Sequence, residues 1–108
     1  MPPAKKRTFH PRRTVLVVSG RQQNEDPDWP VVLVCPISSG DESSPFDVKL
    51  GAGMAGLRIK GWVRGHLVQP LEKEQLQECL SLNPLPSQIL AQVHARVFAY
   101  MDPPLEDA

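Results

Sequence analysis

The sequence predicts a mainly β domain with α structure at its C-terminal end, arranged as a compact antiparallel sheet or a small barrel. Two observations support this fold class: short apolar or alternating runs come first in the chain, and helical periodicity begins only after them. Strands followed by helices argue against alternating βαβ units. We therefore expect the helices to cover one face of the sheet.

Five segments are predicted to be strands: residues 15–18, 31–37, 46–50, 57–63 and 67–69. The first two are continuously apolar, as in strands buried on both faces, whereas residues 46–50 alternate apolar and polar side chains. Residues 20–30, GRQQNEDPDWP, are dense in turn formers and predict a loop. The segment GAGMAG lacks the spacing and flanking elements of a nucleotide-binding loop and predicts a turn.

The period changes to that of a helix from residue 72. Leu76, Cys79 and Leu80 share one side of a short predicted helix, which two prolines separate from a longer one that has Ser87 as its candidate N-cap. The apolar stripe of the longer helix is Ile89, Leu90, Val93, Val97, Phe98 and Met101. We expect this stripe to pack on the core.

Composition excludes several classes of protein. The 108 residues are 41% hydrophobic and 22% charged with no formal net charge, so a site for a charged partner must be a local patch. Cys35 and Cys79 lack metal-binding or redox spacing and are expected to be buried thiols of a reducing compartment. No apolar window is long enough for a membrane span and no signal-peptide core follows the basic N-terminus, so we expect a cytoplasmic protein.

The charged ends of the chain suggest its organisation. Residues 1–11 are basic and interrupted by prolines, which predicts a flexible arm, and residues 103–108 form an acidic tail. Residues 12–102 are predicted to form a single domain.

The order and spacing of several motifs resemble a known family. These motifs are RRTVLVVSG, a polar loop, VVLVCPISS, PFDVKL, a glycine turn, GWVRGHLVQPLEKEQL and a terminal amphipathic helix. They are similar to the MazF/PemK (Kid) toxins of bacterial toxin–antitoxin systems, in which R-P-x-L-V-V-S leads to V-x-x-P-[IL]-[TS]-[ST], then to P-F-[ED]-V and a Q-V-R-x-L-D-like segment. The resemblance implies a small SH3-like barrel (MazF/CcdB/Kid-like) with a C-terminal helix.

The resemblance also implies an activity. Members of this family cleave single-stranded RNA at short sequences without a metal or other cofactor, by attack of the ribose 2′-hydroxyl on the adjacent phosphorus. The products carry 2′,3′-cyclic phosphate and 5′-hydroxyl ends. The family also implies a homodimer and a cognate antitoxin whose acidic, apolar C-terminal segment lies over the RNA site.

Two residues fall at the family's catalytic positions. Arg13 matches the arginine of the R-P pair, and its guanidinium fork suits the charge of a phosphorane. Ser38 matches the hydroxyl residue after the second strand, where it would donate to the same phosphate. On residues alone, a serine that caps its own turn is an equal alternative for Ser38. Ser39 is the candidate if the register slips by one residue.

The N-terminal region departs from the family pattern. The family's opening strand and acidic loop are replaced by MPPAKKRTFHPRR, and Thr14 replaces the usual proline. His10 is a candidate proton donor or acceptor because an unperturbed imidazole titrates near pH 6.5, although a solvated tail histidine is the simpler interpretation.

Five further residues are candidates for RNA binding. Trp29 could stack on a base or pin its loop to the core, and the others could line an RNA groove or form a solvated rim. Gln69 aligns with the arginine of the family's Q-V-R. The candidates are Arg12, Trp29, Arg64, His66 and Gln69.

Two other functions were weighed against an endoribonuclease. A barrel of the same fold that has lost catalysis and binds RNA or a protein remains the main alternative, because the opening strand is missing. A cysteine or serine hydrolase is disfavoured, because the chain has no G-x-S-x-G motif and neither cysteine lies in a nucleophile motif.

Overall fold

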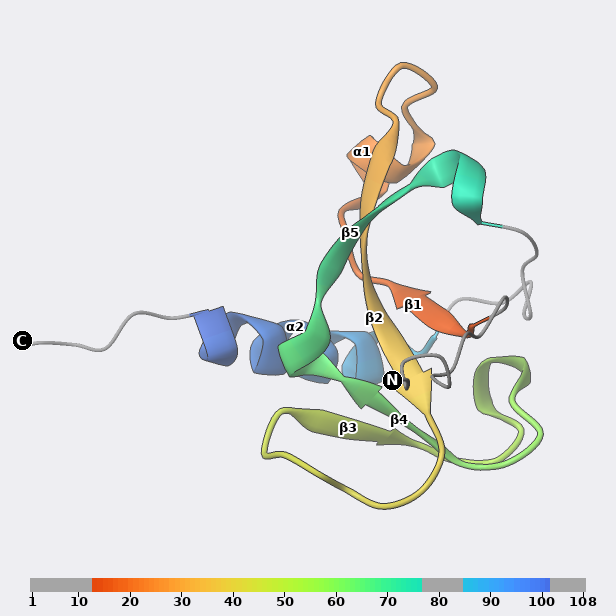
Figure 1. The fold of residues 1–108 in the computed structure, drawn as a ribbon, viewed down its shortest axis with the longest axis vertical. Coiled ribbons are helices and arrows are strands. Elements are labelled where there is room, and N and C mark those ends of the chain that lie inside the picture. Colours follow the sequence, from red (N-terminus) through yellow and green to blue (C-terminus); the bar gives the residue numbers. More distant parts are fainter. Residues whose placement is uncertain (1–12, 77–84, 102–108) are drawn as a thin grey trace, which may run out of the picture.

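The computed structural model describes residues 13–76 and 85–101 (Figure 1). His10, Arg12 and Cys79 therefore lie outside the described residues, as do the predicted arm and acidic tail. The strands are β1 (Val15–Val17), β2 (Val31–Ser38), β3 (Asp47–Leu50), β4 (Gly61–Arg64) and β5 (Gln69–Glu72). The helices are α1 (Arg21–Glu25) and α2 (Ser87–Met101), with single 3₁₀ turns at Met54–Gly56, Gly65–Leu67 and Lys73–Gln75.

Strand β2 is the central element of the sheet. Its first part pairs antiparallel with β1 on one side and β5 on the other, and its last two residues, Ile37 and Ser38, pair antiparallel with β4. Strand β3 then pairs with β4. Figure 1 shows the long β2 passing between β1 and β5 before it reaches β4 and β3. Because β2 belongs to both halves of the sheet, its C-terminal end lies where the two halves meet.

Helix α2 closes the core against the curved sheet. Its Val93 is fully buried among strand residues, and Ile89 and Val97 of the same helix are partly buried against them. The helix starts after Pro86, whose carbonyl accepts hydrogen bonds from the amides of Ile89 and Leu90 (3.0 and 3.1 Å). A proline here costs no helical hydrogen bond, because the first helical amides have no partner within the helix. The other buried residues of this core are Val18, which follows β1 directly, and the strand residues Cys35, Val48, Leu50 and Val63.

The structure confirms the predicted fold class: a mainly antiparallel β domain with a C-terminal helix. Within the described residues the strand path β1-β2-β4-β3 is not closed by a pairing of its ends, so the sheet is bent but is not a complete barrel. Most predicted strands form within one or two residues of their expected bounds. Apolar runs predict the strand positions well in this chain, because strands that are buried on both faces are rich in β-branched residues.

Four local predictions differ from the structure. The loop at residues 20–30 contains the short helix α1, and residues 57–60 form turns before β4 begins at Gly61. The helix predicted from residue 72 is replaced at its start by β5 and a 3₁₀ turn, and its remainder lies outside the described residues. The stripe of α2 is only partly buried, since Phe98 is 72% exposed and Met101 63% exposed. Helical spacing alone does not show how far along a helix the core extends.

The described residues add two further facts. In residues 13–76 and 85–101 the structure contains no helix with the length and hydropathy that a membrane span requires. Cys35 is fully buried, and burial raises the pKa of its thiol to about 11, so it stays protonated and unreactive near neutral pH.

Candidate active site

The register of β1 against β2 bears on Arg13 and Ser38, the two predicted catalytic residues. Val15 lies opposite Pro36, and the Ile37 amide donates to the Thr14 carbonyl (3.0 Å), so the ladder continues one residue beyond the assigned strand. Continued by one more position, the same register would set Arg13 opposite Ser38. Residues directly opposite in an antiparallel pair project to the same face, and both of these are exposed. We therefore expect the predicted cation, Arg13, and the predicted hydroxyl donor, Ser38, to share one surface.

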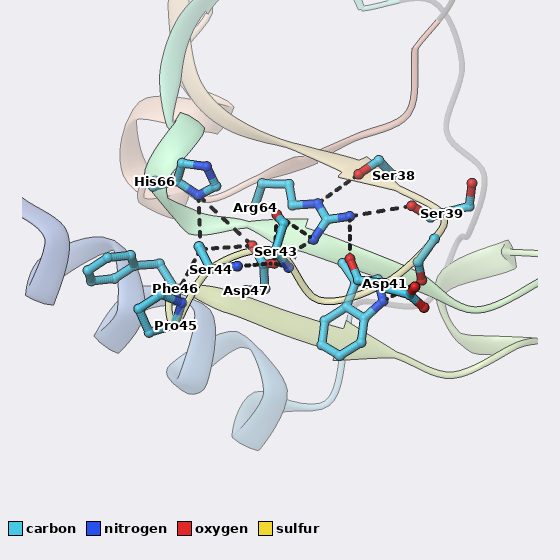
Figure 2. A network of polar contacts seen from close by, with 12 residues as sticks. Ser38, Ser39, Asp41, Ser43, Ser44, Pro45, Phe46, Asp47, Arg64 and His66 are labelled. Atoms are coloured by element: carbon cyan, nitrogen blue, oxygen red, sulfur yellow. Dashed lines mark hydrogen bonds and ion pairs between the residues drawn. The ribbon is translucent and has the colours of Figure 1, made fainter.

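Ser38 is held by Arg64 from the neighbouring strand β4. The Nε–H of Arg64 donates to Ser38 Oγ (2.7 Å) (Figure 2). Because an arginine cannot accept a hydrogen bond, the Ser38 hydroxyl is the acceptor in this contact and its own proton remains available to another group. The hydrogen bond found at Ser38 Oγ comes from Arg64, and it is not the bond to its own turn that the alternative interpretation predicts.

The guanidinium of Arg64 is saturated with protein acceptors. Its side chain is only 9% exposed, and each of its five N–H groups can be matched to a different acceptor. Besides Ser38 Oγ, these acceptors are Ser43 Oγ (3.3 Å), Asp47 Oδ2 (2.5 Å), Ser39 O (3.3 Å) and Asp41 O (3.2 Å). The prediction that Arg64 binds RNA stays untested, but an RNA phosphate would have to displace one of these partners.

The carboxylate of Asp47 anchors this arginine. Asp47 lies opposite Arg64 in the β3–β4 register, and its side chain is fully buried. Its Oδ2 atom also accepts from the Ser43 amide (2.7 Å) and the Ser44 amide (3.1 Å). Burial acts to raise the pKa of Asp47, but the Ser43 amide, the guanidinium of Arg64 and the Ser44 amide outweigh it and lower the pKa below its ordinary value. The pair is therefore ionised at neutral pH.

The backbone between Ser38 and Asp47, the serine loop, is fixed at Gly40 as well. Gly40 has φ of +98°, a left-handed conformation that glycine adopts without strain, and its carbonyl accepts from Lys60 Nζ (2.6 Å) and Trp62 Nε1 (2.9 Å). Trp62 is only half-buried, and its indole N–H is a donor to this loop. Side chains around β4 thus hold the loop at several successive carbonyls.

His66 lies at the other end of the network from Ser38, with Arg64 between them (Figure 2). Its Nδ1 is 3.2 Å from Ser44 Oγ, and Ser44 Oγ is also 3.2 Å from Asp47 Oδ1. An ionised carboxylate can only accept, so the single Ser44 proton points to Asp47 and Nδ1–H of His66 donates to Ser44. In neutral His66 this arrangement leaves Nε2 unprotonated and able to accept a proton.

The remaining predicted site residues make fewer contacts with the hydrogen-bond network around Arg64. Gln69 begins β5, is exposed, and donates through its side-chain amide to the Leu67 carbonyl (3.1 Å). Ser39 is exposed, and only its backbone carbonyl takes part in the network. Arg12 and His10, just before the described part of the chain, stay predictions.

Trp29 lies at the opposite end of β2 from this network. Its side chain is 51% exposed, beside a shallow hollow of about 350 Å³. The hollow is lined by Pro27, Trp29, Pro30, Glu72, Lys73 and Glu74. Asp28 precedes the tryptophan, and the Lys73 ammonium is bound to the carbonyls of Gln23 and Asp26 (2.7 Å each). Carboxylates therefore dominate the charge around this aromatic ring.

No three His, Cys, Asp or Glu side chains gather closely enough to hold a metal ion within the described ranges. The site as described consists of a guanidinium, hydroxyls, backbone amides and a buried ion pair. Such a set can neutralise a phosphate and donate to its oxygens.

Comparison with known proteins decides the family. The chain matches the family model of the PemK-like, MazF-like toxins of type II toxin–antitoxin systems over residues 2–100. It belongs to this family. No curated protein sequence is similar enough to count as a match.

Solved structures share the fold of this MazF-like chain. A MazE-MazF crystal structure (Form-II) from Deinococcus radiodurans is 25% identical with a TM-score of 0.68, covering 84% of this chain and 82% of that one. The Mycobacterium tuberculosis toxin MazF-mt6 is 18% identical with a TM-score of 0.70, covering 83% and 86%. An endoribonuclease in complex with its cognate antitoxin from Mycobacterial species is 16% identical with a TM-score of 0.70, covering 85% and 82%.

Sequence reasoning missed several residues that build the site in this MazF-like chain. Asp47 and Ser43 were not candidates, and neither was Trp62 as a loop donor. A signal for this ion pair was present in the sequence. A carboxylate, Asp47, directly follows the serine loop, and an arginine, Arg64, lies in a later strand. From the alternation of residues 46–50 alone, Asp47 would be expected to face solvent. Only the observed pairing with Arg64 reveals its role.

Proposed function

We propose that this chain is an endoribonuclease toxin that cleaves single-stranded RNA to 2′,3′-cyclic phosphate and 5′-hydroxyl ends. The observation that supports the proposal is the β1–β2 register, which, continued by one position, would set Arg13 opposite Ser38. The Ser38 hydroxyl accepts a hydrogen bond from Arg64 and so keeps its own proton for a phosphate oxygen. Membership of the toxin family supports it, as does the fold shared with a protein described as an endoribonuclease.

The proposed reaction uses these two side chains at one phosphate. The ribose 2′-oxygen attacks phosphorus, the O2′–P bond forms, and the P–O5′ bond breaks. Arg13 would neutralise the negative charge of the phosphorane through two N–H donors, and the Ser38 hydroxyl would donate to a non-bridging oxygen. One proton must leave the 2′-hydroxyl and one must reach the 5′-oxygen.

Proton transfer is proposed for a histidine. His10 is the sequence candidate, and His66 is a second one because its neutral form leaves Nε2 free to accept a proton. Gln69 and Arg12 are proposed to contact the RNA strand. We expect the reaction to require no metal and no organic cofactor.

The proposal includes two protein partners. A cognate antitoxin is expected because solved relatives are MazE-MazF complexes. A second copy of the chain is the other partner, for which an apolar groove of about 530 Å³ between the sheet and α2 is a suitable surface. Its lining includes Leu33, Val68, Phe98 and the small side chains Ala91 and Ala95. An RNA substrate implies action in the cytoplasm.

The test uses purified protein, mixed-sequence single-stranded RNA and a chelator. We expect fragments with 2′,3′-cyclic phosphate ends at a limited set of sequences. Removing the Arg13 donors in Arg13→Ala should lower the cleavage rate by about 100- to 1000-fold, as for loss of an oxyanion donor. Arg21→Ala is a matched control, because Arg21 is exposed on α1 and pairs only with Glu25 in the described structure.

RNA that stays intact at high protein concentration but is retained on the protein would instead favour the alternative, a catalytically inactive barrel. Cleavage that the chelator abolishes would contradict the metal-independent mechanism.

A further inference from the structure

The contacts of Arg64 differ from those expected of an RNA-binding arginine. A side chain that grips phosphate presents its guanidinium to solvent, whereas that of Arg64 is 9% exposed and saturated by five protein acceptors. Four of the five acceptors belong to the serine loop or to the end of β2 that precedes it. The arginine therefore links the loop to the buried Asp47 carboxylate.

The link ends on the hydroxyl with a proposed catalytic role. Nε–H of Arg64 donates to Ser38 Oγ at 2.7 Å, which restricts the χ1 rotamer of Ser38 and occupies one lone pair of its oxygen. A hydroxyl that accepts from a cation also becomes a stronger donor, because the two bonds polarise each other. Its proton lies away from the guanidinium and is available to a phosphate oxygen.

We infer that Arg64 is a positioning residue that acts through Ser38: anchored on Asp47, it fixes the orientation of the Ser38 hydroxyl and the serine loop without touching the substrate. The inference rests on the proposed function and deepens it. It replaces the RNA contact predicted for Arg64 with an indirect role.

A double-mutant cycle between the two residues tests the inference. Arg64→Lys keeps the positive charge beside Asp47 but cannot reach Ser38 and the loop carbonyls together, because an ammonium has three donors on one atom. We expect kcat for RNA cleavage to fall about 10- to 100-fold with KM changed less than about twofold. In a Ser38→Ala background, the same substitution should lower kcat by less than about twofold.

The control for charge and surface effects is Arg21→Lys, which should change neither parameter. Thermal unfolding and near-ultraviolet circular dichroism of each variant establish that it is folded. A fall in kcat of the same size with and without Ser38 would overturn the inference, since Arg64 would then act independently of the hydroxyl.

A second variant tests the inference if Arg64→Lys does not fold. The double substitution Asp47→Asn with Arg64→Gln removes both charges of the buried pair and so leaves no unpaired ion. Its affinity for a single-stranded 2′-O-methyl RNA, which cannot be cleaved, is measured as a function of salt concentration. We expect the slope of log affinity against log salt to match wild type. A slope smaller by about 0.7 would show a lost phosphate contact and contradict the inference.

Failure of the proposed function gives a different result. In that case the wild-type protein cleaves no RNA, and Arg13→Ala changes nothing. Without cleavage there is no reaction for which Arg64 could position Ser38. Wild-type cleavage combined with additive effects of Ser38 and Arg64 would refute the positioning role alone.

Discussion

The two ends of β2 differ in how the polar residues around them are arranged. At the C-terminal end, Ser38 accepts a hydrogen bond from a guanidinium held by a buried carboxylate, and the strand register continued by one position would bring Arg13 opposite Ser38. At the N-terminal end, Trp29 is half-exposed beside Glu72 and Glu74. One end combines a cation with a fixed donor, and the other combines an aromatic ring with carboxylates.

The difference indicates which end suits a phosphodiester. An RNA backbone carries one negative charge per nucleotide, so carboxylates around Trp29 would repel the strand that its ring was predicted to stack on. At the other end the only fully buried carboxylate, Asp47, is neutralised by Arg64 among the described residues. The prediction that Trp29 stacks on an RNA base is therefore weaker than the prediction that Ser38 contacts an RNA phosphate.

The largest effect is expected for the anchor of the C-terminal end. Replacing Asp47 by asparagine leaves Arg64 buried without its counter-ion and should lower the free energy of unfolding by about 3–5 kcal/mol near pH 7. Chemical denaturation of wild type and variant measures this difference. Asp28→Asn, at the exposed N-terminal end, is the matched control and should stay within about 0.5 kcal/mol of wild type.

The same carboxylate predicts an acid dependence. The folded-state pKa of Asp47 is lowered from its ordinary value of 3.8, so its stabilising contribution is fully present above that pH and is lost as the pH falls through the folded pKa. The gap in unfolding free energy between wild type and Asp47→Asn should therefore narrow below about pH 4. A gap that is constant from pH 7 to pH 2 would show that the charge of Asp47 does not matter.

A smaller effect is expected at Gly40. A side chain at its φ of +98° would be strained, so Gly40→Ala should cost about 1–2 kcal/mol and move the carbonyl that Lys60 and Trp62 bind. We expect RNA cleavage to slow with it. Gly51→Ala is the matched control, because no atom lies within 4 Å of its added Cβ and its φ is not left-handed. Equal stability of the two variants would show that the serine loop tolerates a different path.

The smallest effect is expected at the N-terminal end of β2. Trp29→Ala should change the affinity for single-stranded 2′-O-methyl RNA by less than about twofold, since the ring lies among carboxylates. A base stacked on Trp29 would instead be worth about 1–3 kcal/mol, or at least a fivefold change in affinity. That result would restore Trp29 as an RNA contact and remove the contrast between the two ends.

The sequence predicted the parts of this protein that depend on local patterns. The continuous apolar run from Val31 predicted β2, and the glycines predicted turns. The order of motifs from Arg12 to the last helix predicted the family that the comparison confirms. Strand and turn preferences act over a few residues, and motif spacing is read directly from the chain. The residues that face each other across strands were not accessible in this way.

Only the tertiary structure decided how the site is supported. Asp47 and Arg64 are 17 residues apart and meet because β3 and β4 pair in one register, and a shift of one residue would turn Asp47 to the opposite face. The alternation of residues 46–50 predicted a solvated Asp47, whereas the structure buries it as the anchor of an arginine. Strand register depends on the packing of the whole sheet, which is why the sequence predicted Ser38 but not the buried pair that holds it.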